Sequence, residues 1–306
     1  MSGADIEVTL DSVIVAVTDD RPRILTVAGP EGPPSIPSGP LDPGADKTLE
    51  QAMRRWISEL AGITIGYAEQ LYTFGDRRRG RRPDAEPTRW LSVAYLALVR
   101  EEAPAEGAAW VDWYDLFPWE DHRDGWPAMI DVLLIPGLEA WAAAHPGEEA
   151  VRRERIDVMF GREAGWDGIR VLERYELLYE AGLVTEAHLD AGKTPRTGMA
   201  GLAMAHDHRR VAATALGRLR GKLTYRPVVF ELLPDRFTLA TLQTTVEALS
   251  GIRLHTQNFR RLVERNRLVE GTGRTAATGG RPAELFRFRP EVLRERPRPG
   301  VGVPYR

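Results

Sequence analysis

A run of side chains suited to reading DNA lies near the C-terminal end of the 306-residue chain. In the major groove, arginine can donate two hydrogen bonds to guanine, and asparagine or glutamine can pair with adenine. Phe259, Leu262 and Val263 recur among these polar residues at the spacing of a buried helix face. The pattern predicts a recognition helix that starts near His255. Its predicted DNA-contacting residues are Thr256, Gln257, Asn258, Arg260, Arg261 and Arg265.

A predicted β-hairpin follows this helix. Residues 271–281 are rich in glycine and arginine, and residues 285–289 alternate between apolar and basic side chains, as expected of a turn and a strand. Arg274, Thr275 and Arg281 are predicted to contact the DNA from this wing. The preceding segment reads as a helix with Thr238 as N-cap and Gly251 just past its end. Together these elements predict a winged helix-turn-helix, although an arginine-rich helix can also be simply a solvated surface.

Composition narrows the class of protein. The formal net charge is −3, but arginines outnumber acidic residues from Arg253 onward, which indicates a basic end on a more acidic body. The absence of cysteine excludes disulfides, thiolate catalysis and cysteine-ligated zinc. No apolar run approaches the roughly 20 residues that span a bilayer, and the N-terminus lacks the pattern of a signal peptide. The expected location is therefore the cytoplasm, with no membrane partner.

The N-terminal part has the pattern of an α+β unit. Residues 5–17, 23–27, 69–74 and 90–99 are predicted strands, because they alternate or run continuously apolar. Residues 47–60 repeat apolar side chains at helical spacing. A helix packed against a mixed sheet is the expected arrangement.

Two blocks of sequence resemble a known family. LEQAMRRWISELAGI, EQLYTFGD and WLSVAYLAL look like a Nudix domain, and MAHDHRRVAATALGRLRGKLTYRPVVFELLPDRFTLATLQ resembles a linker helix followed by a winged helix. The combination is similar to the Nudix-related transcriptional regulators of NAD metabolism, the NrtR family and its NadQ-type relatives. The resemblance implies an α+β protein with four parts: an N-terminal Nudix-like α/β/α sandwich with a mixed sheet (residues 1–118), a mainly helical insertion (119–200), a linker helix with the winged helix-turn-helix (201–295) and a disordered tail (296–306).

Hydrolysis by a Nudix domain needs several glutamates on one helix to hold Mg²⁺, in the pattern G-x5-E-x7-R-E-U-x-E-E-x-G-U. Aligning the pattern at Gly62 keeps Arg55 and Glu59 but puts Trp56 and Leu60 in glutamate positions. Aligning it at Gly44 keeps two glutamates but loses the acidic pair near the helix end. We favour the first alignment. In either one the metal-binding set is incomplete, so we expect no catalytic residues, no bound metal and no required cofactor.

The resemblance also implies partners. The expected effector is an adenine nucleotide, namely ADP-ribose, NAD or ATP, and the expected macromolecular partner of a homodimer is palindromic operator DNA. Repression of NAD biosynthesis or salvage genes would follow. The predicted effector-binding residues are Tyr72, Phe74, Arg77, Arg78, Arg79, Arg89 and Glu59. Two alternatives stay open, a Nudix pyrophosphatase that carries a DNA-binding module and a winged helix that binds protein instead of DNA.

Overall fold

The computed structural model describes residues 6–29, 32–76, 89–161, 165–195, 198–277, 282–295 and 299–303. Its central sheet has the strand order β4-β5-β1-β2-β6, and β3 also pairs with β1. β1 and β5 are parallel, and the other paired strands are antiparallel, so the sheet is mixed as predicted. The strands are β1 (Ile6–Thr18), β2 (Arg21–Val27), β3 (Ser38–Pro40), β4 (Tyr67–Phe74), β5 (Arg89–Leu98) and β6 (Ala108–Asp112).

Both faces of the sheet are covered, because β1 carries apolar side chains on each side. Leu10 and Ile14 face helix α1 (Leu49–Ala61), while Val13 and Val15 face the opposite layer. The Thr48 side chain caps the start of α1 by accepting a hydrogen bond from the backbone N–H of residue 51. Gly62 ends the helix in the left-handed conformation, with φ 67°. The helix end therefore agrees with the alignment of the Nudix pattern at Gly62.

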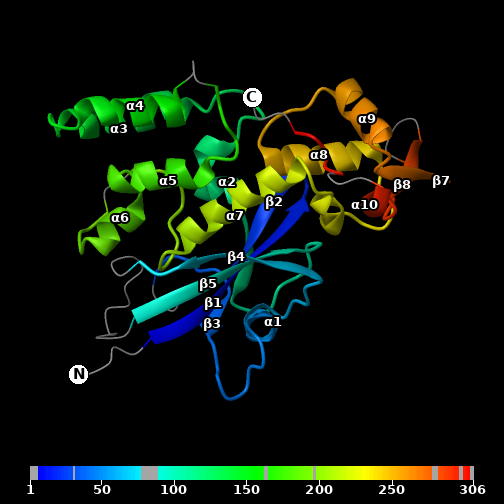
Figure 1. Ribbon diagram of the computed structural model, residues 1–306, viewed down its shortest axis with the longest axis horizontal. Helices are drawn as coiled ribbons and strands as arrows, with labels where there is room; N and C mark the ends of the chain where they lie inside the picture. Colours follow the sequence, from blue (N-terminus) through cyan, green and yellow to red (C-terminus); the bar gives the residue numbers. More distant parts are fainter. Residues whose placement is uncertain are drawn as a thin grey trace.

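The layer opposite α1 is built around helix α7 (His208–Leu223), which lies between the sheet and the other helices (Figure 1). α7 packs on β1 and β4 and also contacts α5 and α8. One continuous buried cluster extends from this sheet face through α7 into the C-terminal part. Thus α7 belongs to the cores of both the sheet domain and the winged helix.

Residues 113–190 are mainly helical. Figure 1 shows α3 and α4 as an outer pair beyond α5. The sequence predicted a break at Pro136 and Gly137. Instead, a π-helical turn over Ile130–Leu134 leads directly into α3, in which Pro136 is the second residue, so the helix continues past the proline. The helices are α2 (Trp113–Leu116), α3 (Ile135–Ala143), α4 (Glu149–Phe160), α5 (Val171–Glu180) and α6 (Thr185–Asp190).

The C-terminal part is a winged helix, as the sequence predicted. Thr238 caps α8 through its side chain, and Gly251 follows the helix with φ 73°. A bridge between Phe237 and Phe286 ties the segment before α8 to the wing. The elements are a 3-10 turn (Val228–Leu232), α8 (Leu239–Ser250), α9 (Thr256–Arg265), β7 (Val269–Ala276), β8 (Ala283–Phe288) and α10 (Val292–Glu295). The α+β class with a C-terminal winged helix is thereby confirmed.

The tail departs from the prediction of disorder. Val301 and Val303 are buried, and the Val301 N–H donates to the carbonyl of Leu223 at 2.8 Å. The prediction was wrong for residues 299–303, because it weighed the prolines and arginines and overlooked two apolar side chains that can join the core. The other tail residues, 296–298 and 304–306, lie outside the described residues.

Candidate functional site

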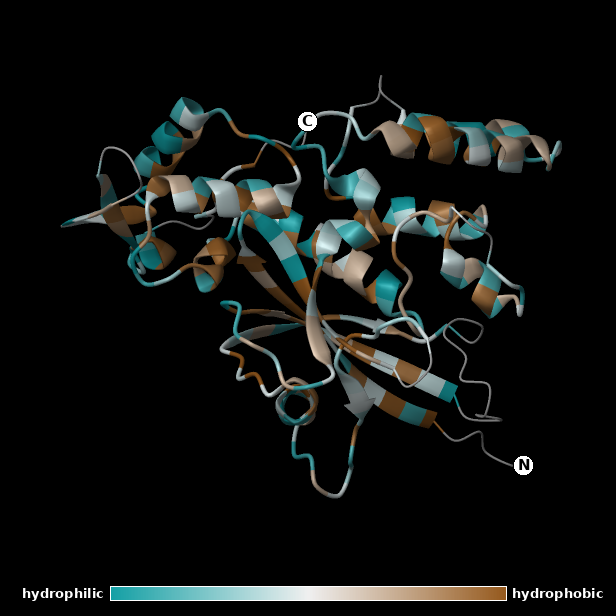
Figure 2. Ribbon diagram, turned by 180° about the vertical axis from the view of Figure 1, so that it is seen from behind, coloured by the Kyte–Doolittle hydropathy of each residue, from teal (hydrophilic) through white to brown (hydrophobic). Residues whose placement is uncertain are grey.

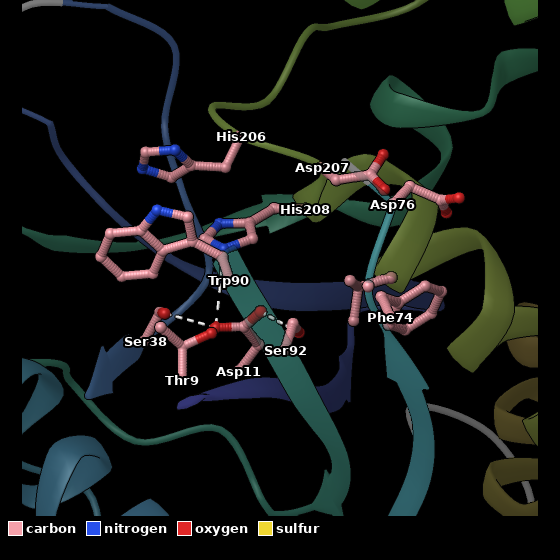
Figure 3. A pocket seen from close by; sticks show the side chains of 12 residues that line it. Thr9, Asp11, Ser38, Phe74, Asp76, Trp90, Ser92, His206, Asp207 and His208 are labelled. Carbon is pink, nitrogen blue, oxygen red and sulfur yellow. Dashed lines mark hydrogen bonds and ion pairs between the residues drawn. The ribbon is translucent and has the colours of Figure 1, made fainter. Parts of the chain in front are cut away.

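A polar cavity lies on the sheet face covered by α7 (Figure 3). Its walls come from β1, β3, β5, the end of β4 and the first turn of α7. The cavity therefore lies on the opposite side of the sheet from α1, the helix that would carry the metal in a Nudix hydrolase. The family resemblance implies a different place for the effector pocket, between α1 and the neighbouring strands.

Asp11 is the charged group at the floor of this cavity. The hydroxyls of Ser38 and Ser92 donate to its two carboxylate oxygens, and Nε2 of His208 lies 3.8 Å from one of them. Nδ1 of His208 accepts the backbone N–H of Ile36 at 3.2 Å, so the ring proton is on Nε2, facing Asp11. Burial by itself raises the pKa of Asp11, but His208 and the two hydroxyls outweigh it and hold the pKa below its ordinary value. The cavity thus contains an ionised carboxylate.

The remaining described walls include aromatic and acidic side chains together with His206. Phe74 is buried, and the Arg210 guanidinium lies 5.2 Å from its ring centre. Arg210 pairs with Asp76, with Glu176 at 2.7 Å and with Asp207 at 3.2 Å, so its charge is already balanced by carboxylates. Carboxylates accept hydrogen bonds, so the described lining suits the hydroxyl or amino donors of a nucleoside better than a phosphate.

The predicted effector-binding residues are not gathered at one place. Phe74 lines the cavity, whereas Tyr72 is largely exposed and stacks edge-on against Phe74. Arg89 donates to the carbonyl of Gly75 at 2.8 Å, beside the cavity. Glu59 is on α1, across the sheet. Arg77, Arg78 and Arg79 lie outside the described residues.

Sequence reasoning missed Asp11, Ser38, Ser92 and His208 as a group, because β-sheet pairing and the first turn of α7 bring them together from distant parts of the chain. One signal was available. Asp11 precedes the apolar run Val13–Val17 within strand β1, and a buried carboxylate needs partners to stay charged. His206 also lines the cavity, two residues before His208.

Helix α1 stands where a Nudix hydrolase would carry its metal-binding glutamates, and its side chains have other partners here. Trp56 lies against Gly39 of β3, so closely that a Cβ added to Gly39 would come within 2.0 Å of the tryptophan ring. The indole N–H of Trp56 donates to the carbonyl of Pro40 at 2.9 Å. Glu50 pairs with Arg54 at 2.8 Å, and Glu59 pairs with Arg55 at 3.6 Å.

Glu50 and Glu59 cannot act as one carboxylate cluster, because nine residues of helix separate them by about 13 Å. Within the described ranges no group of three or more histidine or acidic side chains is placed to hold a metal ion. None of the helices described there is long and apolar enough to cross a membrane.

The predicted recognition helix presents its polar face outward. Phe259 and Val263 are buried, while all six predicted DNA-contacting residues of α9 are exposed, and the helix is coloured largely hydrophilic in Figure 2. Arg274 and Thr275 are exposed on β7, just after a bulge that follows Gly271. Arg281 lies outside the described residues. The DNA-contacting roles of these residues stay predictions.

A buried charge cluster joins the sheet domain to the winged helix. The Glu120 carboxylate accepts from Arg174 at 2.7 and 2.9 Å and from Arg220 of α7 at 2.6 Å. Arg220 also donates to the carbonyl of Leu249 in α8 at 3.1 Å. The Tyr114 hydroxyl donates to the carbonyl of Ala248 at 2.7 Å. These bonds fix α8 to α7 and to α2, the helix that follows strand β6.

The architecture defines a class of protein, a Nudix-like sandwich fused to a winged helix. Residues 229–288 match the NrtR DNA-binding winged helix domain. A protein named "ADPR responsive transcriptional repressor NtrR" from Acinetobacter baylyi is 37% identical over 87 residues, which are 28% of this chain and 35% of that relative. The chain therefore aligns with only about a third of the length of that relative.

Two solved structures share the fold over most of both chains. Shewanella oneidensis NrtR complexed with a 27mer DNA has a TM-score of 0.58 at 21% identity, covering 94% of this chain and 95% of that one. A MutT/nudix family protein from Enterococcus faecalis has a TM-score of 0.52 at 13% identity, covering 94% and 88%.

The resemblance to the NrtR family is thus confirmed, for the winged helix by sequence and for the whole chain by fold. The residues left out of the Shewanella match are far fewer than the segment 119–200, since 94% of the chain is covered. Most of that segment therefore belongs to the shared architecture and is not an insertion peculiar to this chain.

Proposed function

We propose that the protein is a transcriptional repressor that binds operator DNA through α9 and the wing and responds to an adenine nucleotide, ADP-ribose first among the candidates. As a homodimer it would place two recognition helices on a palindromic operator, with half-sites about one DNA turn, roughly 34 Å, apart or a multiple of it. The regulated genes would be those of NAD biosynthesis or salvage. A regulator of this kind works where the chromosome is, which agrees with the expected cytoplasmic location.

One observation carries the proposal. A single helix, α7, forms a wall of the polar cavity with its first residue, His208, and holds the winged helix with Arg220 near its other end. A ligand that prefers one arrangement of this helix changes the position of the DNA-binding face, because coupling requires only that the two arrangements differ in ligand affinity. The Acinetobacter relative is named for its response to ADPR, which supports ADP-ribose over NAD and ATP.

The test is a gel-shift titration of the protein against its own upstream region and NAD-biosynthesis promoters, with and without ADP-ribose, NAD and ATP. We expect a specific shift that ADP-ribose changes at least tenfold in apparent affinity. A specific shift indifferent to all three nucleotides would retain the regulator and remove the nucleotide response. The absence of any specific shift would remove the regulator as well.

We further propose that the Nudix-like domain does not hydrolyse its ligand. Trp56 stands at a metal-binding position of the pattern, and Glu59 is engaged by Arg55. With Mg²⁺ and ADP-ribose we expect no AMP release above background, and Glu59→Gln should leave ADP-ribose binding unchanged. AMP release that Glu59→Gln abolishes would instead establish a pyrophosphatase.

Asp11→Asn is expected to weaken ADP-ribose binding at least tenfold, or about 1.4 kcal/mol, since a neutral amide binds a ligand hydroxyl less strongly than a carboxylate does. Isothermal titration calorimetry measures the affinity, and thermal melting checks that the variant is folded. Asp19→Asn is the matched control, because Asp19 is exposed in the β1–β2 turn with φ 50°, a conformation that asparagine tolerates. Equal affinity in both variants would place the ligand outside this cavity.

A further inference from the structure

Residues 299–303, here called the C-terminal strap, lie between the end of α7 and helix α9. We propose that the strap positions the recognition helix and connects it directly to α7, so that a movement of α7 reaches α9 without passing through α8. This inference rests on the proposed function for its consequence in DNA binding. The attachment itself stands on the contacts below.

At α7, the strap satisfies the helix end. The last carbonyls of an α-helix have no partner within the helix, and the N–H of Val301 donates to one of them, that of Leu223, at 2.8 Å. Gly300 lies so close to the backbone of Thr224 and Tyr225 that a Cβ there would come within 2.3 Å of their atoms. Backbone cannot yield as a flexible side chain can, so only glycine fits at this position.

At α9, the strap holds the C-terminal half of the helix. The side chain of Asn266, the residue that follows α9, donates to the carbonyl of Gly300 at 3.3 Å. Gly302 has φ 62° and lies against Leu262, where a Cβ would be 2.9 Å from the leucine side chain. The same strap residues therefore contact both helices.

The strap matters because α9 has few other anchors. Only Phe259 and Val263 of its ten residues are buried. Val301 is 1% exposed and Val303 5% exposed, so the strap adds two apolar side chains to the core on which α9 rests. At about 1.5 kcal/mol or more for each buried valine, this contribution is comparable to that of the helix's own anchors.

The route from effector to DNA is then short. α7 has 16 residues, so about 24 Å separate its first turn in the polar cavity from its strap-bound end. α8 is attached to α7 through Arg220, and α9 is attached to α7 through the strap. The two helices of the helix-turn-helix, α8 and α9, therefore both follow the position of α7.

Gly300→Ala tests the inference, with Gly147→Ala as the matched control, because a Cβ at Gly147 meets nothing within 4 Å. A second variant ends the chain after Glu295 and so removes the strap. In both strap variants we expect amide hydrogen exchange in α9 to accelerate at least tenfold, operator affinity to fall at least tenfold, and the change that ADP-ribose makes in operator affinity to shrink toward none. ADP-ribose affinity itself should stay as in the wild type.

Each readout has an opposing result. Unchanged hydrogen exchange in α9 of the truncated chain would overturn the attachment, whether or not the protein binds an operator. Lower operator affinity with an unaltered response to ADP-ribose would overturn the connection to α7. If the wild type itself shows no operator shift or no response to ADP-ribose, the proposed function fails, and hydrogen exchange still decides the attachment.

Discussion

Glu120→Gln is expected to destabilise the folded protein by about 3–5 kcal/mol, because it removes a carboxylate that pairs with two buried guanidinium groups. Arg174 and Arg220 are 1% and 0% exposed, so neither can turn to water when its partner is lost. The amide has nearly the same volume as the carboxylate. The loss of folding stability therefore measures the missing charge and not a cavity. Thermal melting should show a fall in Tm on the order of 10 °C.

Glu180→Gln is the matched control. Glu180 accepts two hydrogen bonds from Arg155, at 3.2 and 2.6 Å, but both side chains are nearly half exposed. Exposed ion pairs contribute roughly 0–1 kcal/mol, so the control should melt within about 2 °C of the wild type. Similar Tm values for the two variants would mean that the Glu120 cluster is not what holds α7, α8 and the sheet together.

The same cluster predicts a pH dependence. Burial raises the pKa of Glu120, but Arg174 and Arg220 outweigh it and hold the pKa below its ordinary value of 4.5. A carboxyl with a depressed folded-state pKa stabilises the fold above its unfolded-state pKa and loses that contribution as the pH falls through the folded value. The Tm difference between wild type and Glu120→Gln should thus be full at pH 7 and shrink below pH 4.5. A difference that stays constant down to pH 3 would contradict this assignment.

The winged helix could be predicted from the sequence because its signals are local. Thr238 and Gly251 mark the two ends of one helix, and Phe259 and Val263 mark the buried face of the next. Each of these features depends on neighbours a few residues away, so the backbone pattern alone identifies it. Four strands of the sheet, β1, β2, β4 and β5, were predicted for the same reason, whereas β3 and β6 were not.

The candidate effector site could not be predicted, because its parts meet only through the sheet. Parallel pairing sets Asp11 of β1 beside β5, where Ser92 lies, and antiparallel pairing sets it opposite Ser38 of β3. The residues around Asp11, Ser38 and Ser92 do not determine which strands pair or in which register. Glu120 and Arg220 are 100 residues apart in the sequence, so no local pattern predicts that they pair. Of the effector-binding residues predicted from the resemblance, Phe74 lines this cavity, and their binding roles stay predictions.

Arg261→Ala is expected to remove most of the preference for operator over other DNA, at about 1–3 kcal/mol for each half-site. Arg261 is two residues from both Phe259 and Val263, which places it about 200° around the helix from each of them, on the side away from the core. Arg261→Lys keeps the charge but not the planar fork that forms two hydrogen bonds with guanine. It should therefore lose nearly as much operator affinity as the alanine variant. Competition gel shifts with operator and random duplexes measure the preference.

Salt titration separates the two ways in which Arg261 can act. If Arg261 contacts a phosphate, the slope of log affinity against log salt should become less negative by about 0.9 in Arg261→Ala and stay close to wild type in Arg261→Lys. A base contact would instead cost both variants their operator preference while the lysine variant keeps the wild-type slope. Arg218→Ala, at an exposed position on α7 and outside the winged helix, should change neither quantity. If both Arg261 variants bind operator as the wild type does, α9 does not read the bases and the recognition-helix assignment is wrong.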